Sequence, residues 1–352
     1  MNVLVFGGTG AMGVPVVRHC SELADVYVTS RREHEDSERI HYLVGNAHSV
    51  DFLKKDVFCR HYDVIIDFMT YSTDEFRSKV NLFLEATDRY VFLSSARVYA
   101  DSDQVLTEDA PRILDTCTDN TYLATDEYAL AKARCEDILK QKKENNWTIV
   151  RPYITYNSQR LQLGVYEKEN WLRRYLDGHT IVIPKDIMNK ETTLTYGEDV
   201  AYRIATLAMS REAQGQVFNV SNPQSFLWGD ILQIFDKLLF EITGNKLKVR
   251  FVEDSVGLQK VWHKYQIIYD RLYSRRFDNS KQEAICGGSY IALEDGLSKC
   301  LRECIENPQY AKNKIKAAYE GWSDRMTGEH TSISSISGHK DKLRYLRRRY
   351  FF

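Results

Sequence analysis

The sequence predicts an α/β fold, a Rossmann-like doubly wound parallel sheet, and two observations predict it. A glycine-rich stretch, Gly7-Gly-Thr-Gly-Ala-Met-Gly13, stands between a short apolar run at residues 3–6 and a helix-like segment that starts at Val14. Beyond it, short apolar runs alternate with segments of helical periodicity. This alternation is typical of βαβ units, in which helices cover both faces of a parallel sheet.

The apolar runs that follow the first one are predicted as strands at residues 26–29, 41–44, 63–67 and 89–93. In a doubly wound sheet, ligands bind at the carboxyl ends of the strands. The residues immediately after each strand are therefore the candidates for a binding site.

The first of these segments is the glycine stretch. A phosphate can approach backbone N–H groups only where no Cβ stands in the way, and the N-terminus of the following helix adds a partial positive charge. The G-x-x-G-x-x-G spacing between a strand and a helix predicts a dinucleotide pyrophosphate site, formed by Gly7, Thr9, Gly10, Ala11, Met12 and Gly13. A plain β–α turn is the alternative.

The second strand ends in Ser30-Arg31-Arg32, where a dinucleotide fold normally places an acid on the ribose 2′-hydroxyl. A hydroxyl and two guanidinium groups would instead bind a 2′-phosphate. We therefore expect NADP (or NAD) as the cofactor, with the alternative that the arginines only solvate a loop. Residues 68–71 follow the fourth strand, and Met69 is expected to line the adenosine or pyrophosphate.

A third group of polar residues follows the fifth strand and continues in a predicted helix. Ser94-Ser95 comes directly after the strand, and Tyr128-Ala-Leu-Ala-Lys132 places a phenol and an ammonium group one helical turn apart. A neighbouring lysine stabilises the phenolate, and a serine hydroxyl can hold a substrate oxygen. In a chain with 22 tyrosines, a Tyr-x-x-x-Lys pair alone has little specificity. Its combination with the serine after the strand and with the glycine loop is a specific signal.

These stretches resemble the extended short-chain dehydrogenases/reductases, the NAD-dependent epimerases and dehydratases that act largely on nucleotide sugars. The similarity covers about residues 1–285 and is carried by Gly7–Gly13, Ser94–Tyr99, Tyr128–Lys132, Val150–Tyr156, Thr195–Ala201, Phe218–Ser221 and Phe277–Lys281. The resemblance implies that Tyr128 is the general acid/base. It further implies that Lys132 is the partner of Tyr128 and of the cofactor ribose, that Ser95 donates to the substrate oxygen, and that Pro152 lies beside the nicotinamide.

The same resemblance implies a domain organisation and a mode of assembly. Residues 1–155, with 193–222 returning, would form the dinucleotide-binding domain, and 156–192 with 223–325 a smaller C-terminal substrate domain. A homodimer is expected, because relatives often pair through two helices that include the one with the tyrosine.

The sequence departs from the family pattern after Ser95. The sugar 4,6-dehydratases have an Asp-Glu pair where this chain has Ala96-Arg97. Because the elimination of water needs a second acid and base, a dehydratase is disfavoured, which leaves an NAD(P)-dependent reductase or epimerase of a nucleotide-linked sugar, with hydride transfer at a ring carbon. The alternative is a non-enzymatic dinucleotide-sensing or RNA-binding protein on the same fold.

Composition limits the partners of the chain. The net charge of −1 favours neither nucleic acid nor a membrane surface, and no apolar run has the length of a membrane span, so a cytoplasmic protein is expected. The seven cysteines are scattered without zinc-like spacing, so we expect reduced thiols and no metal.

Several other residues have two open interpretations. Arginines that could bind a substrate diphosphate, or only solvate the surface, are Arg160, Arg173, Arg174, Arg271, Arg275 and Arg276. Trp171 and Trp228 are expected in the core, and His263 is expected to be non-catalytic.

The last segment, residues 326–352, reads as a polar linker followed by a basic aromatic tail. The tail could dock on an anionic membrane, a nucleic acid or a partner subunit. Docking on the chain itself is the alternative.

Overall fold

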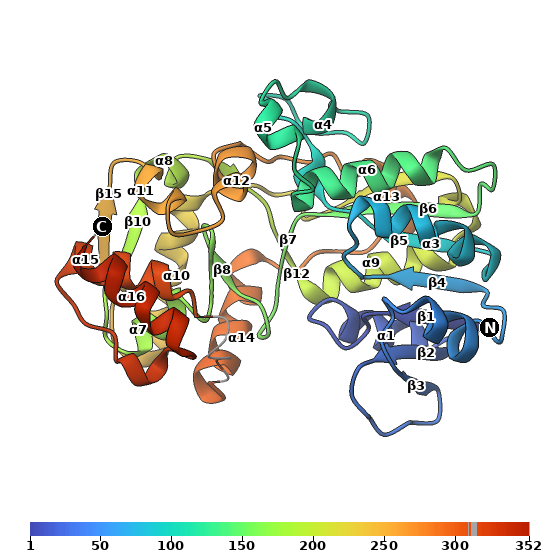
Figure 1. Ribbon diagram of the computed structural model, residues 1–352, viewed down its shortest axis with the longest axis horizontal. Helices are drawn as coiled ribbons and strands as arrows, with labels where there is room; N and C mark the ends of the chain where they lie inside the picture. The colour runs from blue at the N-terminus through green and yellow to red at the C-terminus, as the bar shows by residue number, and fades with distance from the viewer. Residues whose placement is uncertain (309, 311–314, 352) are drawn as a thin grey trace.

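The computed structural model describes residues 1–308, 310 and 315–351. Its centre is a parallel seven-stranded sheet in the order β13-β6-β5-β4-β1-β2-β3 (Figure 1). The strands are β1 (Asn2–Phe6), β2 (Asp25–Ser30), β3 (Ile40–Val44), β4 (Val64–Asp67), β5 (Tyr90–Leu93), β6 (Trp147–Pro152) and β13 (Gln216–Val220). The predicted Rossmann-like fold is confirmed, and each predicted strand agrees with the observed one to within one residue at each end.

Both faces of this sheet are buried. Val3 and Val5 of β1 pack with α1 (Gly13–Ser21) and α9 (Gly197–Met209) on one face. Leu4 and Phe6 pack with α3 (Thr73–Glu85) and α6 (Tyr128–Lys140) on the other. This two-sided burial explains why the strands are continuous apolar runs rather than alternating ones.

The strand order reverses between β1 and β4, the position at which doubly wound sheets bind ligands. The glycine loop follows β1, and Phe68 and Met69 follow β4. The fold therefore brings the first two predicted binding segments to one edge of the sheet.

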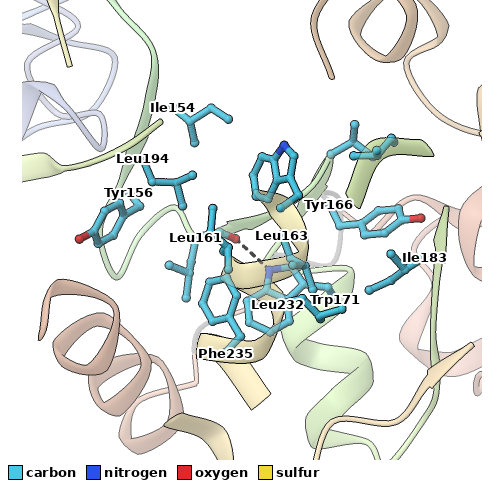
Figure 2. Packing of buried hydrophobic residues seen from close by; sticks show 14 of the residues in the cluster. Ile154, Tyr156, Leu161, Leu163, Tyr166, Trp171, Ile183, Leu194, Leu232 and Phe235 are labelled. Atoms are coloured by element: carbon cyan, nitrogen blue, oxygen red, sulfur yellow. Dashed lines mark hydrogen bonds between the residues drawn. The ribbon is translucent and has the colours of Figure 1, made fainter. Parts of the chain in front are cut away.

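The elements on the other side of the molecule enclose a separate core (Figures 1 and 2). The indole N–H of Trp171 donates to the Leu161 carbonyl over 3.1 Å, and its ring lies 4.7 Å from that of Phe235. Trp228 is also buried here, so both tryptophans are core residues as expected. The strands and helices of this part, together with the linking pair β7 and β12, are β7 (Ile154–Tyr156), β8 (Gln162–Leu163), β9 (Tyr166–Glu167), α7 (Trp171–Leu176), β10 (Ile181–Pro184), α8 (Lys185–Met188), β11 (Glu191–Thr192), β12 (Leu194–Tyr196), β14 (Phe226–Leu227), α10 (Trp228–Thr243), β15 (Val249–Val252), α11 (Val256–Gln259), α12 (Lys264–Gln266) and α14 (Leu293–Glu306).

Helix α6 is covered on its outer side by its own chain. A segment between β5 and α6 carries α4 (Ile113–Thr116) and α5 (Asn120–Leu123), and Leu130 of α6 is buried against Ile113 and Tyr122. Arg112, just before α4, pairs with Asp137 of α6 at 2.7 Å. The two remaining helices near the sheet are α2 (Val50–Phe52) and α13 (Ser280–Cys286).

The C-terminal segment folds back on the chain, which is the self-docking alternative. Helix α16 (His339–Tyr350) packs on α15 (Ala317–Thr327), and the fully buried Tyr345 donates its hydroxyl to Asp324 over 2.8 Å. A Cβ at Gly321 would collide with the Tyr345 carbonyl, so the glycine permits the close approach of the two helices. Phe352 lies outside the described residues. No helix in the described part of the chain combines the length and apolarity needed to span a membrane.

Candidate active site

The glycine loop is shaped by backbone contacts that exclude side chains. Gly7 has φ of +70°, and its carbonyl accepts from the Gly10 N–H over 3.1 Å. A Cβ on Gly13, the first residue of α1, would collide with the Gly7 carbonyl and the Gly8 backbone. Since this cradle leaves backbone N–H groups uncovered at a helix N-terminus, it fits the pyrophosphate of a dinucleotide.

A groove of about 150 Å³ runs along this loop. Its lining combines the loop with residues from two later segments: Gly7, Gly10, Ala11, Met12, Gly13, Phe68, Thr155, Asn157 and Arg160. The Asn157 amide donates to the Ala11 carbonyl over 2.7 Å and so fixes the loop from the far side of the groove. Thr155 and Asn157 were missed in the sequence, because only the pairing of β7 with β12 places them here.

We expect Gly13→Ala to weaken dinucleotide binding by more than tenfold. The added methyl group meets backbone atoms that cannot rotate away, so the loop must open. Gly229→Ala in α10 is the matched control for an added methyl group away from the loop, since its Cβ would lie 3.4 Å from the Met188 carbonyl, a tolerable distance. Fluorescence titration with NADH and NADPH, with thermal unfolding of both variants, measures the effect. Equal affinity of Gly13→Ala and wild type would show that the loop does not hold the cofactor.

The end of β2 presents three residues of the predicted ribose site. Ser30 is buried and its hydroxyl accepts from the Arg32 N–H over 3.1 Å. The side chains of Arg31 and Arg32 are exposed and form no ion pair within the described residues. Their binding of a 2′-phosphate stays a prediction.

Tyr128 and Lys132 lie one above the other at the start of α6. The Lys132 ammonium is 6.0 Å from the centre of the Tyr128 ring and donates to the carbonyls of Leu93 (2.6 Å) and Met69 (3.1 Å). These two bonds use two of its three donors and hold it at the carboxyl ends of β4 and β5. The geometry allows Lys132 to stabilise a phenolate at Tyr128.

Ser95 and Tyr128 line one cavity of about 570 Å³, together with Pro152. Met12 and Arg160 line this cavity and also the glycine-loop groove. The structure thus brings the predicted acid/base, the predicted hydroxyl donor and the predicted cofactor loop to adjoining spaces. Their catalytic roles remain predictions.

Two charged residues beside Tyr128 were not predicted as site residues. The Arg97 guanidinium lies 5.2 Å from the centre of the Tyr128 ring and pairs with Glu127 at 2.7 Å. Glu127 also caps α6 by accepting from the Ala129 N–H over 2.9 Å. The sequence signal for Arg97 was its place two residues after Ser95, and the signal for Glu127 its place directly before Tyr128.

His263 also lines the cavity, although the sequence suggested no role for it. Burial lowers its pKa, and the positive charges of Lys316 and Arg97 lower it further. The imidazole is therefore neutral at neutral pH.

The arginines considered for substrate binding separate into two groups. Arg160 and Arg271 line the cavity. The substrate interpretation is wrong for the buried Arg174, which pairs with Glu320 (2.7 Å) and Asp324 (2.9 Å), and Arg173, Arg275 and Arg276 are likewise paired within the chain. Asp324 also belongs to a group with His179 and Glu329 that has the spacing of metal ligands. Both carboxylates of this group, those of Asp324 and Glu329, already pair with Arg174.

The model of the NAD-dependent epimerase/dehydratase family matches residues 3–221, more than half of the chain. The chain belongs to this family. Membership covers the glycine loop, Ser95, Tyr128 and Lys132, which all lie in the matched range.

Solved structures of epimerases and dehydratases share the fold of this family member at low identity. The UDP-glucuronic acid 4-epimerase from Bacillus cereus, in complex with UDP-glucuronic acid and NAD, is 15% identical with a TM-score of 0.65, covering 86% of this chain and 98% of that one. The dTDP-glucose 4,6-dehydratase from Bacillus anthracis, in complex with NAD, is 16% identical with a TM-score of 0.67, covering 89% and 99%.

A relative with a different description matches by sequence. The chloroplast stem-loop binding protein of 41 kDa b from Arabidopsis thaliana is 28% identical over 190 residues, which is 53% of this chain and 45% of that protein. The chain therefore spans less than half of the length of this relative.

A buried ion pair between Glu136 and Arg151 connects the elements that carry the site residues. Glu136, one turn after Lys132, accepts from Arg151 of β6 over 2.8 and 2.6 Å and from the Ser94 hydroxyl over 2.5 Å. Burial would raise the pKa of Glu136, but Arg151 and Ser94 outweigh burial and hold it below its usual range. The pair joins α6, β6 and the end of β5, the three elements that carry Lys132, Pro152 and Ser95.

Proposed function

We propose that this protein is an NAD(P)-dependent oxidoreductase or epimerase of a nucleotide-linked sugar. The observation that carries the proposal is the shared lining: Ser95 and Tyr128 face one cavity, which meets the glycine-loop groove at Met12 and Arg160. Family membership and neighbours crystallised with NAD and nucleotide sugars support it.

The residues of the chain have separate roles in this reaction. Ser95 holds the hydroxyl or carbonyl oxygen of the reacting ring carbon, and Tyr128 gives or takes the hydroxyl proton. Lys132 stabilises the phenolate and binds the cofactor ribose. The dinucleotide, when bound, supplies the acceptor or donor of the hydride. Pro152 faces the same cavity and would border the nicotinamide.

The local charges favour a reductase or epimerase over a dehydratase. Elimination of water from a sugar requires a second acid and base, and Ala96 and Arg97 provide neither. The exposed guanidinium groups of Arg31 and Arg32 favour NADP over NAD.

A direct test incubates the protein with NAD⁺, NADP⁺ or their reduced forms and a panel of nucleotide sugars. Absorbance at 340 nm detects net oxidation or reduction, and NMR of the sugar detects epimerisation. The proposal expects a new sugar product that depends on the dinucleotide. A panel that yields no product with any dinucleotide, on a protein that binds none of them, would overturn it.

We also propose that the protein forms a homodimer, as the family resemblance implies. Because α4 and α5 cover the outer side of α6, a dimer would use the neighbouring surface of α3 more than α6 itself.

The stem-loop binding relative favours RNA binding as a second candidate function. Helix α16 offers an exposed basic face for it, with Lys340, Arg344 and Arg347 at helical spacing. If RNA is the ligand, a change of these three residues to Gln should weaken stem-loop binding at least tenfold and reduce the salt dependence by about three ions.

Gel-shift titration at several salt concentrations measures this prediction. The control for net charge changes three exposed lysines on the sheet side of the molecule, Lys54, Lys55 and Lys143, to Gln. Stem-loop binding that the α16 variant leaves unchanged would exclude this surface.

A further inference from the structure

A cluster of charged residues beside the cavity, of which Arg97, Arg271 and Glu127 line it, carries more positive charge than its carboxylates balance. The fully buried Asp270 lies within ion-pair distance of Arg97 (3.6 Å), Arg275 (3.5 Å) and Arg271. In the described part of the chain, the second carboxylate that pairs with these arginines is Glu127. Three cations thus share two anions. A buried excess charge is unfavourable unless a ligand or solvent compensates it.

Arg97 is the member of this group with donors left for a ligand. The guanidinium of Arg275 is occupied by two backbone carbonyls, and that of Arg271 by a carbonyl, Gln162 and Asp270. Arg97 donates from Nη2 to Glu127, and its Nε is buried and faces Asp270 at 3.6 Å. Its side chain lines the cavity. Arg97 is therefore held at Nη2 and Nε, and Nη1, for which no hydrogen bond is found in the described part of the chain, is the nitrogen left for a ligand.

The position of Arg97 relates its Nη1 to the reacting carbon of the substrate. Its guanidinium lies 5.2 Å from the ring of Tyr128, and it follows Ser95 by two residues. If Ser95 and Tyr128 hold the oxygen of the reacting carbon, Arg97 faces a substituent of the adjacent carbon. In a hexose that reacts at C4, the adjacent carbons carry the C3 hydroxyl and C6, and of these two substituents C6 is the one that can be a carboxylate. The diphosphate, on C1, stands across the ring and away from Arg97.

We propose that Arg97 selects a nucleotide-linked uronic acid by binding its C6 carboxylate. This inference rests on the proposed function. A carboxylate accepts charge-assisted hydrogen bonds from a guanidinium and balances the excess charge of the cluster, whereas the C6 hydroxymethyl group of a neutral hexose does neither.

Two ligands that differ only at C6 test the inference. Calorimetric titration of the protein loaded with NADP⁺, or with NAD⁺ if NADP⁺ does not bind, should show at least tenfold tighter binding of UDP-glucuronate than of UDP-glucose. In Arg97→Gln the ratio should fall below threefold, while the affinity for UDP-glucose stays within threefold of the wild type. Arg160→Gln removes an exposed arginine of the same cavity and should keep the ratio.

The outcomes separate this inference from the proposed function. Equal binding of the two ligands by the wild type, or a ratio that Arg97→Gln preserves, overturns the role of Arg97 alone. Binding of neither ligand overturns the proposed function as well. If Arg97→Gln does not fold, Arg97→Lys takes its place. Lysine keeps the charge beside Glu127 but loses the fork of donors, so the ratio should fall below that of the wild type, and an unchanged ratio overturns the role of Arg97.

Discussion

Replacing Tyr128 by Phe should lower the turnover of the nucleotide sugar by about 10²–10⁴-fold, while dinucleotide affinity stays within threefold. The phenol hydroxyl is the proton donor and acceptor of the proposed reaction. The ring that remains still packs beside Lys132 and Arg97. Initial rates under the assay conditions that give a product, together with NADH and NADPH titrations, measure both quantities.

A matched substitution separates the role of the hydroxyl from a general effect of its loss. Tyr202 of α9 is partly exposed and donates its hydroxyl to the Cys286 carbonyl over 3.0 Å, away from the cavity. Tyr202→Phe should keep the rate within twofold. A Tyr128→Phe enzyme with nearly the wild-type rate would remove Tyr128 from the mechanism.

Replacing Glu136 by Gln should reduce the free energy of unfolding by about 3–5 kcal/mol. The change leaves the guanidinium of Arg151 buried without a counter-ion, and both side chains are almost fully buried. Exposed ion pairs contribute about 0–1 kcal/mol, so Glu253→Gln, which breaks the exposed pair with Lys185, is the control. Denaturant unfolding of the three proteins measures the difference.

The same pair predicts a pH dependence with a definite sign. Because the folded-state pKa of Glu136 is lowered, its contribution to stability is present above the unfolded pKa of about 4.3. The contribution is lost as pH falls through the folded-state value. The wild type should therefore lose more stability than Glu136→Gln below about pH 4, and parallel pH profiles of the two proteins would contradict the assignment.

The parts of the fold that depend on local sequence were predictable. A buried apolar run followed by glycines and a helix determines β1, the loop and α1 with few alternatives, because only glycine fits at Gly7 and Gly13. The spacing of Tyr128 and Lys132 is a property of a single helix. Their common cavity with Ser95 followed from the family resemblance.

Contacts between distant segments were not predictable. Arg174 and Arg160 look alike in the sequence, but Arg174 meets Glu320 and Asp324 about 150 residues later, whereas Arg160 faces the cavity. The close approach of α16 to α15 requires the absence of a Cβ at Gly321, opposite the Tyr345 carbonyl. Such pairings have no signature in the spacing of residues, because they form only when distant segments pack together in the part of the molecule away from the seven-stranded sheet.

The most direct measurement of the central claim is mass spectrometry of the dinucleotide that the purified protein retains or takes up. We expect NAD or NADP to bind. Tightly retained NAD would indicate an epimerase that regenerates its cofactor at each turnover and would argue against the role of Arg31 and Arg32. An empty site that takes up NADPH more tightly than NADH would indicate a reductase. Binding of neither dinucleotide would contradict the account and favour the RNA-binding alternative.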